Sequence, residues 1–219
     1  MIHANRLLVL LPLVLAVPLS RGAAQTCAGT AAFRDGRLRL GAFYQSNHDI
    51  YDGGFNVAVG IPQSLYFNIT LDARGDFPTP PPPGDPDPGF GGAQWPEMGA
   101  GIEFGYQIYV ADTPLEFCPA VMWHAASNPN SYQVSERGFG GSVGYRFPVS
   151  TQLALVPAAG VRWVTTTRCC LASPAYNDVS VVMGLVFHKT LTLQPGLLAR
   201  SQSGSKIIYT LTLSTNRLK

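Results

Sequence analysis

The chain has 219 residues and a formal net charge of +2 at pH 7, with only 13% Asp, Glu, Lys and Arg against 46% hydrophobic residues. The charged share is about half that of an average soluble domain, which argues against a water-soluble β protein with charged outer faces. The small net charge also argues against nucleic-acid binding.

Residues 1–24 are predicted to be a secretory signal peptide. Arg6 supplies the positive start, Leu7–Leu19 is an apolar core too short to span a membrane as a helix, and small residues precede a cleavage point after Ala24. No lipoprotein-type cysteine motif follows, so no lipid anchor is predicted. Removing the two arginines of this segment leaves 13 basic and 13 acidic residues, so the mature chain is expected to be neutral.

Ten later segments alternate apolar with small or polar side chains, which is the period of a β-strand. In the clearest, MGAGIEFGYQIYV at 98–110, every even position is apolar, and the run is long enough for the roughly 9–11 tilted residues with which a strand crosses a bilayer. In chain order, the predicted strands cover residues 36–45, 55–61, 64–73, 98–110, 115–125, 139–147, 153–163, 178–188, 191–197 and 206–213.

The predicted connections alternate between short turns and longer loops, and the longest, from Arg74 to Glu97, contains seven prolines between Pro78 and Pro88. Outer-membrane barrels have short periplasmic turns and longer outer loops. The predicted fold class is therefore all-β, an up-and-down antiparallel transmembrane β-barrel of about ten strands, with eight as the alternative count. Residues 25–35 are expected to form a periplasmic lead segment and residues 36–214 the barrel domain. An even strand count places both termini in the periplasm.

The face opposite the apolar one carries mostly Gly, Ala, Ser, Thr and Asn, with about one charge per strand, which suits a narrow lumen. A secreted lipocalin-like barrel, the alternative, would need Lys and Glu there. Because buried charges must be paired and ten strands leave little interior space, we expect a salt-bridge network that fills the lumen. The alternative interpretation of these charges is that they line a narrow passive pore for small solutes. The predicted lumen charges are Arg37, Arg39, Asp72, Glu103, Glu116, Arg146, Arg162, Asp178 and Lys206.

Aromatic residues gather on the predicted lipid face, several of them near strand ends. Such residues form girdles at the two interfaces of a membrane barrel. The expected partners of this face are outer-membrane lipid and lipopolysaccharide. The predicted girdle residues are Tyr44, Phe104, Tyr106, Trp123, Tyr145, Phe147, Trp163 and Phe187.

The segment Gly144–Trp163, GYRFPVSTQLALVPAAGVRW, has an aromatic strand end, a Pro turn and an apolar strand with Gly before Trp. It resembles hairpins of the small outer-membrane β-barrel families of Gram-negative bacteria, the OmpA-like transmembrane domain and its relatives. The resemblance covers about residues 36–214 and is architectural. It implies an integral outer-membrane protein with a structural or surface-interaction role, without a catalytic signature or cofactor. Such barrels usually end in an aromatic residue, whereas this chain ends in Asn216-Arg217-Leu218-Lys219.

A polar group near the outer end of one strand raises an enzymatic alternative. His124, Ser127 and Asn128, with Glu136 across a predicted loop, could form a triad that deacylates lipid A. Lipid A deacylase barrels carry His-x-Ser-Asn, whereas the spacing here is His-x-x-Ser-Asn. The extra residue turns Ser127 to the opposite face of a strand, so the main prediction is that the protein is not an enzyme.

Two predicted outer loops could bind ligands. The proline-rich loop is expected to be a stiff spacer and could bind a surface ligand. The loop SNHDIYDGG could hold a cation through His48, Asp49 and Asp52, but its composition is that of an ordinary turn, so no metal site is predicted.

The four cysteines fit an oxidising compartment. Cys118 faces the predicted lumen near the periplasmic end, where the lead segment also lies, and we predict a Cys27–Cys118 disulfide. Cys169 and Cys170 lie in a predicted outer loop, where they form a vicinal disulfide or bond another chain.

Overall fold

The computed structural model describes residues 38–47, 50–61, 64–76, 97–110, 113–127, 133–168, 171–172, 175–188, 190–201 and 207–215. Several predictions fall outside these residues: the signal peptide, the lead segment, most of the proline-rich loop, and the residues Cys27, Arg37, His48, Asp49, Asn128, Cys169, Cys170 and Lys206. Over the described ranges, no helix has the length and apolar character needed to cross a membrane.

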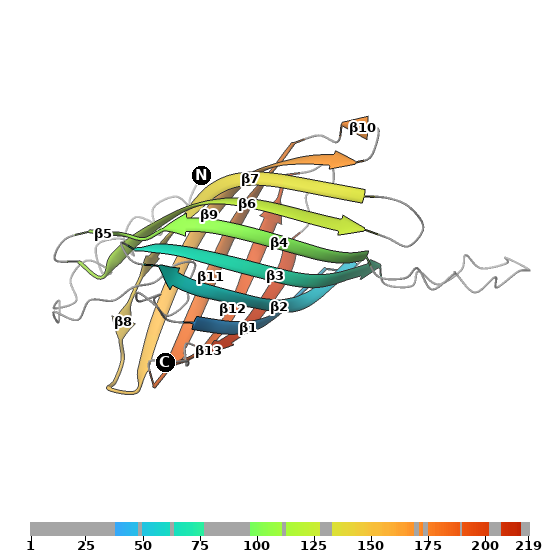
Figure 1. Cartoon of the computed structure of the whole chain (residues 1–219). Coiled ribbons are helices and arrows are strands. Elements are labelled where there is room, and N and C mark those ends of the chain that lie inside the picture. Colours follow the sequence, from blue (N-terminus) through green and yellow to red (C-terminus); the bar gives the residue numbers. More distant parts are fainter. Residues whose placement is uncertain are drawn as a thin grey trace, which may run out of the picture.

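The described residues form thirteen β-strands (Figure 1). They are β1 (Leu38–Ser46), β2 (Ile50–Ile61), β3 (Leu65–Asp76), β4 (Glu97–Tyr106), β5 (Ile108–Tyr109), β6 (Leu115–Ser127), β7 (Gln133–Tyr145), β8 (Phe147–Pro148), β9 (Leu153–Arg168), β10 (Leu171–Ala172), β11 (Tyr176–Phe187), β12 (Leu191–Arg200) and β13 (Ile207–Thr215).

The strands close into one antiparallel barrel. β5 continues the line of β4 along β6, β8 continues the line of β7 along β9, and β10 is a short return along β9. Ten strands therefore surround the lumen, and the last closes on the first where β13 pairs with β1, for example at Leu40 opposite Thr215. The prediction of an all-β, up-and-down barrel of ten strands is confirmed.

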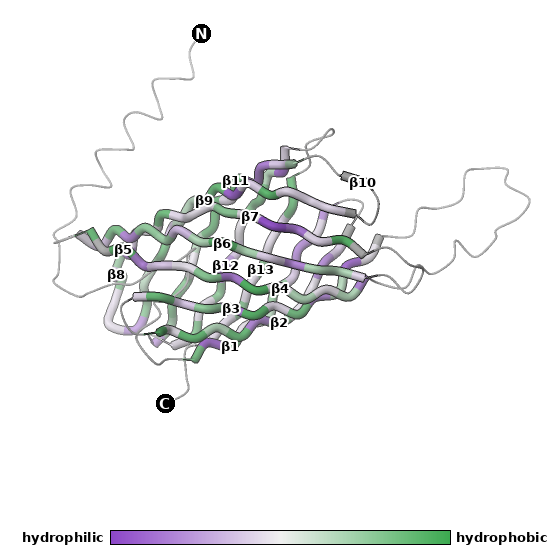
Figure 2. Tube along the Cα trace, turned by 45° about the horizontal axis from the view of Figure 1, so that its top comes forward, coloured by the Kyte–Doolittle hydropathy of each residue, from purple (hydrophilic) through white to green (hydrophobic). Residues whose placement is uncertain are grey.

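The two faces of the wall differ in polarity, as the period of two requires. Along β4, Met98, Ile102 and Phe104 are exposed on the outer face, while Gly101 and Gly105 on the inner face are buried. Figure 2 shows hydrophobic and hydrophilic residues alternating along the strands. The outer face exposes large apolar side chains from strand to strand around the barrel, far more than a soluble monomer leaves in water.

Several strands extend further than the sequence predicted. β2 begins at Ile50 instead of 55, β7 begins at Gln133 instead of 139, and β12 continues to Arg200. The predicted loops SNHDIYDGG and SNPNSYQVSER are therefore largely strand, so the alternation of loop lengths is weaker than predicted. Asp, Asn, Ser and Gly favour turns, but cross-strand pairing holds these residues in the ladder here.

The barrel has two ends that differ in their connections. At one end, here the turn end, β2 joins β3, β5 joins β6, β8 joins β9 and β11 joins β12, and β1 begins and β13 finishes at this end. The opposite end, here the loop end, includes the connection of residues 77–96 between β3 and β4. In Figure 1, β5 and β8 mark the turn end on the left.

Candidate functional site

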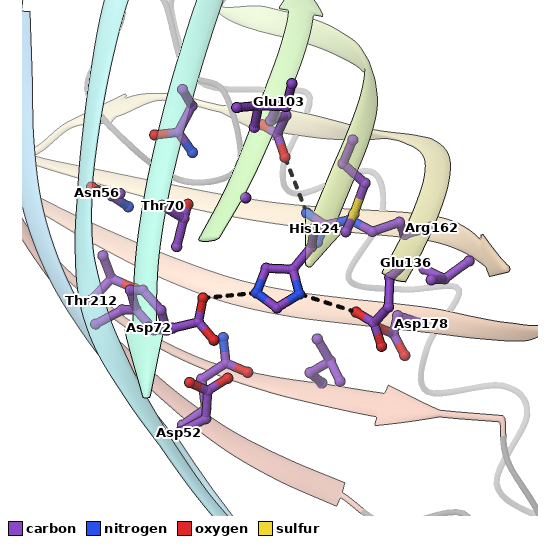
Figure 3. A pocket seen from close by; sticks show the side chains of 18 of the residues that line it. Asp52, Asn56, Thr70, Asp72, Glu103, His124, Glu136, Arg162, Asp178 and Thr212 are labelled. Carbon is purple, nitrogen blue, oxygen red and sulfur yellow. Dashed lines mark hydrogen bonds and ion pairs between the residues drawn. The ribbon is translucent and has the colours of Figure 1, made fainter. Parts of the chain in front are cut away.

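A cavity of about 310 Å³ lies in the lumen, and each of the ten barrel strands contributes to its wall (Figure 3). The lining is predominantly polar and includes both acidic and basic side chains. One residue from each strand, in chain order, is Arg39, Asp52, Asp72, Glu103, His124, Glu136, Arg162, Asp178, Arg200 and Ser214.

His124 lies between two carboxylates. Its Nε2 is 2.8 Å from Oδ1 of Asp72, and its Nδ1 is 3.9 Å from Oε2 of Glu136 (Figure 3). Glu136 is the direct cross-strand neighbour of His124, whereas Asp72 is on β3, beyond β4. The doubly protonated imidazole ring donates from both nitrogens, so this form best suits a site with a carboxylate on each side.

Gly99 of β4 permits the contact between Asp72 and His124. A Cβ at this position would lie 2.5 Å from Oδ2 of Asp72 and 2.6 Å from Nε2 of His124. Any side chain at Gly99 would therefore push the two groups apart. The hydrogen bond across β4 depends on this glycine.

The chain of contacts continues from Glu136 to the far side of β9. The Tyr176 hydroxyl donates to Oε1 of Glu136 at 3.1 Å, and the Arg200 guanidinium lies 4.1 Å from the centre of the Tyr176 ring. Arg200 also donates from Nε and Nη2 to both oxygens of Asp178, at 2.9 Å each. Paired planar groups of this kind form the stronger class of hydrogen bond.

These contacts make a polar belt around much of the lumen near the loop end. It contains four buried carboxylates, together with Arg74, His124, Tyr176 and Arg200, and we call it the carboxylate belt. A further ion pair of the belt joins Arg74 Nη2 to Asp52 Oδ2 at 3.6 Å. The four carboxylates are those of Asp52, Asp72, Glu136 and Asp178.

A second tier of contacts lies toward the turn end. Glu103 accepts a hydrogen bond from the Tyr66 hydroxyl at 3.1 Å and pairs with Arg162 Nη2 at 3.5 Å. Tyr66 lies over Gly105, where a Cβ would overlap its ring. Because Glu103 is on β4 and Arg162 is on β9, this ion pair spans the two strands between them, β6 and β7.

Beyond this tier, toward the turn end, lies a set of almost wholly buried side chains. We call this set the turn-end plug, and its members are 0–2% exposed. Its composition is mixed, with polar and apolar groups, and the Cys118 sulfur is disulfide-bonded. The members are Gln107, Glu116, Cys118, Val156 and Thr192.

The cavity wall also holds acceptor atoms without a hydrogen-bond partner among the described residues. They include Asp52 Oδ1, Asn56 Oδ1, Asn68 Oδ1 and Ser214 Oγ. Buried polar atoms of this kind are normally satisfied by ordered water. The cavity is therefore a polar site that suits water and small polar molecules.

The structure describes seven of the nine predicted lumen charges. Asp72, Glu103, Asp178, Arg39 and Arg162 line the cavity, Glu116 belongs to the turn-end plug, and Arg146 is half-buried where β7 meets β8. Glu103 and Arg162 pair with one another. Asp72 and Asp178 instead pair with residues outside the predicted set.

Five members of the belt are absent from the predicted lumen charges, although Glu136 and Asp52 were named for other roles. The five are Asp52, Arg74, Glu136, Tyr176 and Arg200. Each was assigned to a loop or to none of the strands. The alternation does contain a signal, because these residues keep the phase of the lumen-facing positions of their own strands. The alternation assigns these residues to the lumen only if each strand is extended past residues that favour turns.

The predicted girdle residues occupy outward-facing positions. Six are 36–47% exposed, and Tyr145 and Phe147 are half-buried with ring centres 4.3 Å apart. Their role as an interfacial girdle stays a prediction. The six exposed residues are Tyr44, Phe104, Tyr106, Trp123, Trp163 and Phe187.

The structure does not bring Ser127 to His124. Ser127 is exposed at an outward-facing position of β6, whereas His124 points into the lumen toward Asp72 and Glu136. No nucleophile–base pair is formed by these residues. Asp52, from the predicted cation loop, pairs with Arg74, and no group of three metal-ligating side chains occurs in the part of the chain that is described.

The predicted Cys27–Cys118 disulfide is tested on one side only. Cys118 is 2% exposed and is disulfide-bonded. Its partner lies outside the described residues, so the pairing with Cys27 stays a prediction.

No protein-family model and no curated protein matches this sequence. Among solved structures, the beta domain of the Bordetella autotransporter BrkA is similar, with a TM-score of 0.51 and 10% identity over 83% of this chain and 98% of that chain. The N-terminal β-barrel domain of Pseudomonas aeruginosa OprF has a TM-score of 0.35 and 9% identity over 84% of this chain and 98% of that chain. An outer membrane channel from Pseudomonas putida F1 has a TM-score of 0.43 and 10% identity over 90% and 99%.

The likeness to the autotransporter domain shows the fold alone, because the sequence identity is low. That fold is the β-barrel of bacterial outer-membrane proteins. The narrower assignment to the OmpA-like family stays a prediction.

Proposed function

We propose that this protein is an integral outer-membrane barrel whose lumen is closed by its own side chains, and that it acts as a structural or surface-interaction protein instead of a pore. The observation that supports this proposal is the turn-end plug. Its members come from the line of β4 and β5, from β6, from β9 and from β12, so the packing involves several sides of the barrel. A solute crossing the lumen would have to displace side chains that are at most 2% exposed.

The outer face supports the placement in a membrane. The barrel strands are 9–16 residues long, apart from the short segments β5, β8 and β10, and so suffice to cross a bilayer. Their outward-facing side chains are large and apolar on strand after strand. Closure of β13 on β1 leaves no open sheet edge, which the bilayer interior would not tolerate.

The lumen favours a sealed barrel over a narrow passive pore. Its charges are arranged as pairs, Asp52 with Arg74, Asp178 with Arg200 and Glu103 with Arg162. The first two pairs join neighbouring strands and the third crosses the lumen, and in each pair the two charges neutralise one another. The fully buried plug then closes the route past the cavity. The proposed location is the outer membrane, with both termini on the periplasmic side.

Ion conductance in planar lipid bilayers tests the proposal. We expect the refolded wild-type protein to give no resolved channel steps at moderate voltage. The variant Gln107→Ala/Glu116→Ala removes two plug side chains and is expected to conduct, because it opens the turn end.

The matched control is Asn68→Ala/Thr70→Ala, which enlarges the cavity wall and leaves the plug intact, and it should stay silent. Stable, uniform single-channel steps from the wild type would contradict the proposal and support the narrow pore. Folding of each variant is checked by its gel mobility before and after boiling.

A further inference from the structure

Arg137 is the exception to the apolar outer face. Among the charged side chains that the structure describes on the strands, it alone occupies an outward-facing position. Its neighbour Glu136 points into the lumen, and Arg137, one residue later, is exposed on the outside. A charge on this face is costly in a bilayer unless it reaches the polar headgroup region or an anion.

The surroundings of Arg137 are aromatic. Its cross-strand neighbours are Trp123 on β6 and Thr165 on β9. Two residues further along β7, Phe139 stacks on Trp163 of β9, with ring centres 5.2 Å apart and an interplanar angle of 21°. We call Arg137, Trp123, Phe139 and Trp163 the Arg137 patch.

A groove of about 390 Å³ lies beside this patch and reaches the buried residues Val164 and Tyr176. Trp123, Arg137, Phe139 and Trp163 line it, together with Asn177 at the beginning of β11. The indole of Trp123 is held in place by a hydrogen bond from Nε1 to the hydroxyl of Ser135 at 3.1 Å. The groove therefore combines a cation with fixed apolar walls.

The guanidinium of Arg137 has no ion-pair or hydrogen-bond partner within the described part of the chain. Guanidinium carries five N–H donors in a planar fork that matches phosphate, and it is the side chain most often used to recognise that group. An unpaired arginine beside aromatic rings at a membrane surface is thus available to bind an anion from outside the protein.

The position of Arg137 along β7 indicates which anion this is. Arg137 is the fifth residue from the loop end of β7, and Phe139 and Trp163 lie on its turn-end side. Tryptophan marks the membrane–water interface. In the proposed orientation, with the loop end outward, Arg137 is nearer the outer surface than Phe139 and Trp163.

We propose that the Arg137 patch binds a phosphorylated lipid of the outer leaflet, with the phosphate on Arg137 and an acyl chain along Phe139 and Trp163. This inference rests on the proposed membrane placement and goes beyond it by assigning a site and a ligand class. The patch fixes the lipid at the seam of β6, β7 and β9.

Native mass spectrometry of the full chain, refolded in detergent, tests the site. The probes are bisphosphorylated lipid A and the same lipid after enzymatic removal of its phosphates. We expect Arg137→Gln to bind the phosphorylated lipid about tenfold more weakly than the wild type, as expected for one charge-assisted contact. Arg137→Lys should recover part of this loss, and the dephosphorylated lipid should bind the wild type and Arg137→Gln equally.

Arg146→Gln is the matched control, because it removes an arginine at the turn end and should bind as the wild type does. Equal binding by Arg137→Gln and the wild type would overturn the proposal. A dimer that disappears in Arg137→Gln would also overturn it and identify a second copy as the occupant. Displacement of the lipid by millimolar inorganic phosphate would show an unspecific anion site.

The boiled and unboiled gel mobilities of every variant separate this inference from the proposed function. If all variants are heat-modifiable and the lipid result is negative, only the lipid site fails. If the wild type is not heat-modifiable and does not insert into vesicles, the membrane placement fails instead.

Discussion

Gly99 lies between Asp72 and His124, and the space above its Cα is what allows these two side chains to meet. Which contacts form in the lumen therefore depends on its glycines as much as on its charged residues. Gly105 likewise leaves space for Tyr66. The Tyr66 ring covers Gly105, and its hydroxyl donates to Glu103. Small residues on the inner face set which charged groups can reach across a strand.

The first prediction concerns Gly99→Ala. A Cβ there would separate Asp72 from His124 and leave a buried polar pair unsatisfied, so we expect the free energy of unfolding to fall by about 1–3 kcal/mol. The measurement is urea unfolding of the refolded protein in lipid vesicles, followed by tryptophan fluorescence.

Gly53→Ala serves as the control, because a Cβ at Gly53 meets only ordinary contacts at 3.5 Å and beyond. It should change stability by less than about 0.5 kcal/mol. Since His124→Ala removes the side chain that Gly99→Ala would displace, the two substitutions should be clearly non-additive. Additive losses would show that Gly99 acts independently of the histidine.

At the scale of the elements, the period of two predicts most of the barrel. The strand count, the two faces of β3 and β4, and the outward position of the aromatic residues could be predicted because lipid and lumen impose opposite chemistry on alternate positions. The pairing of β13 with β1 also follows, since a membrane barrel cannot leave an edge open.

The carboxylate belt could not be predicted in the same way. Asp72, His124 and Asp178 lie in strands that the sequence predicts. The other five members lie where β2, β3, β7, β11 and β12 extend toward the loop end, past Asp, Asn, Ser and Gly residues that favour turns when each segment is considered alone. Contacts such as that between Asp72 and His124 depend further on the register across β4, which the sequence does not encode locally. Long-range pairing overrides local preference at these positions.

A cross-link tests closure of the barrel. Ala42 of β1 is directly opposite Leu213 of β13, a spacing at which two cysteines can form a disulfide. We expect oxidised Ala42→Cys/Leu213→Cys to yield a peptide cross-link, detected by mass spectrometry after digestion.

The control pair, Ala42→Cys/Val181→Cys, joins β1 to β11, which is not its neighbour, and should give no intramolecular cross-link. A cross-link in the control pair, or none in the neighbouring pair, would mean that the first and last strands meet differently.

At the scale of the whole molecule, a closed barrel resists detergent because it has no free edge from which to unzip. We expect the protein to be in the outer-membrane fraction and to migrate differently before and after boiling in a detergent gel. A soluble periplasmic or secreted protein without a mobility shift would contradict the membrane placement and favour a lipocalin-like barrel. The reduced protein, measured in parallel, shows how far the disulfide at Cys118 contributes to this resistance.

In the sealed barrel that we propose, the cavity and the buried turn-end residues beneath it would make the lumen a blind well. A molecule that enters such a well must leave through the same mouth, so it contributes no net flux, whatever gradient exists across the membrane. The quantity that matters is then equilibrium occupancy, set by concentration and affinity on one side alone. Net transport through such a barrel would require the plug to move.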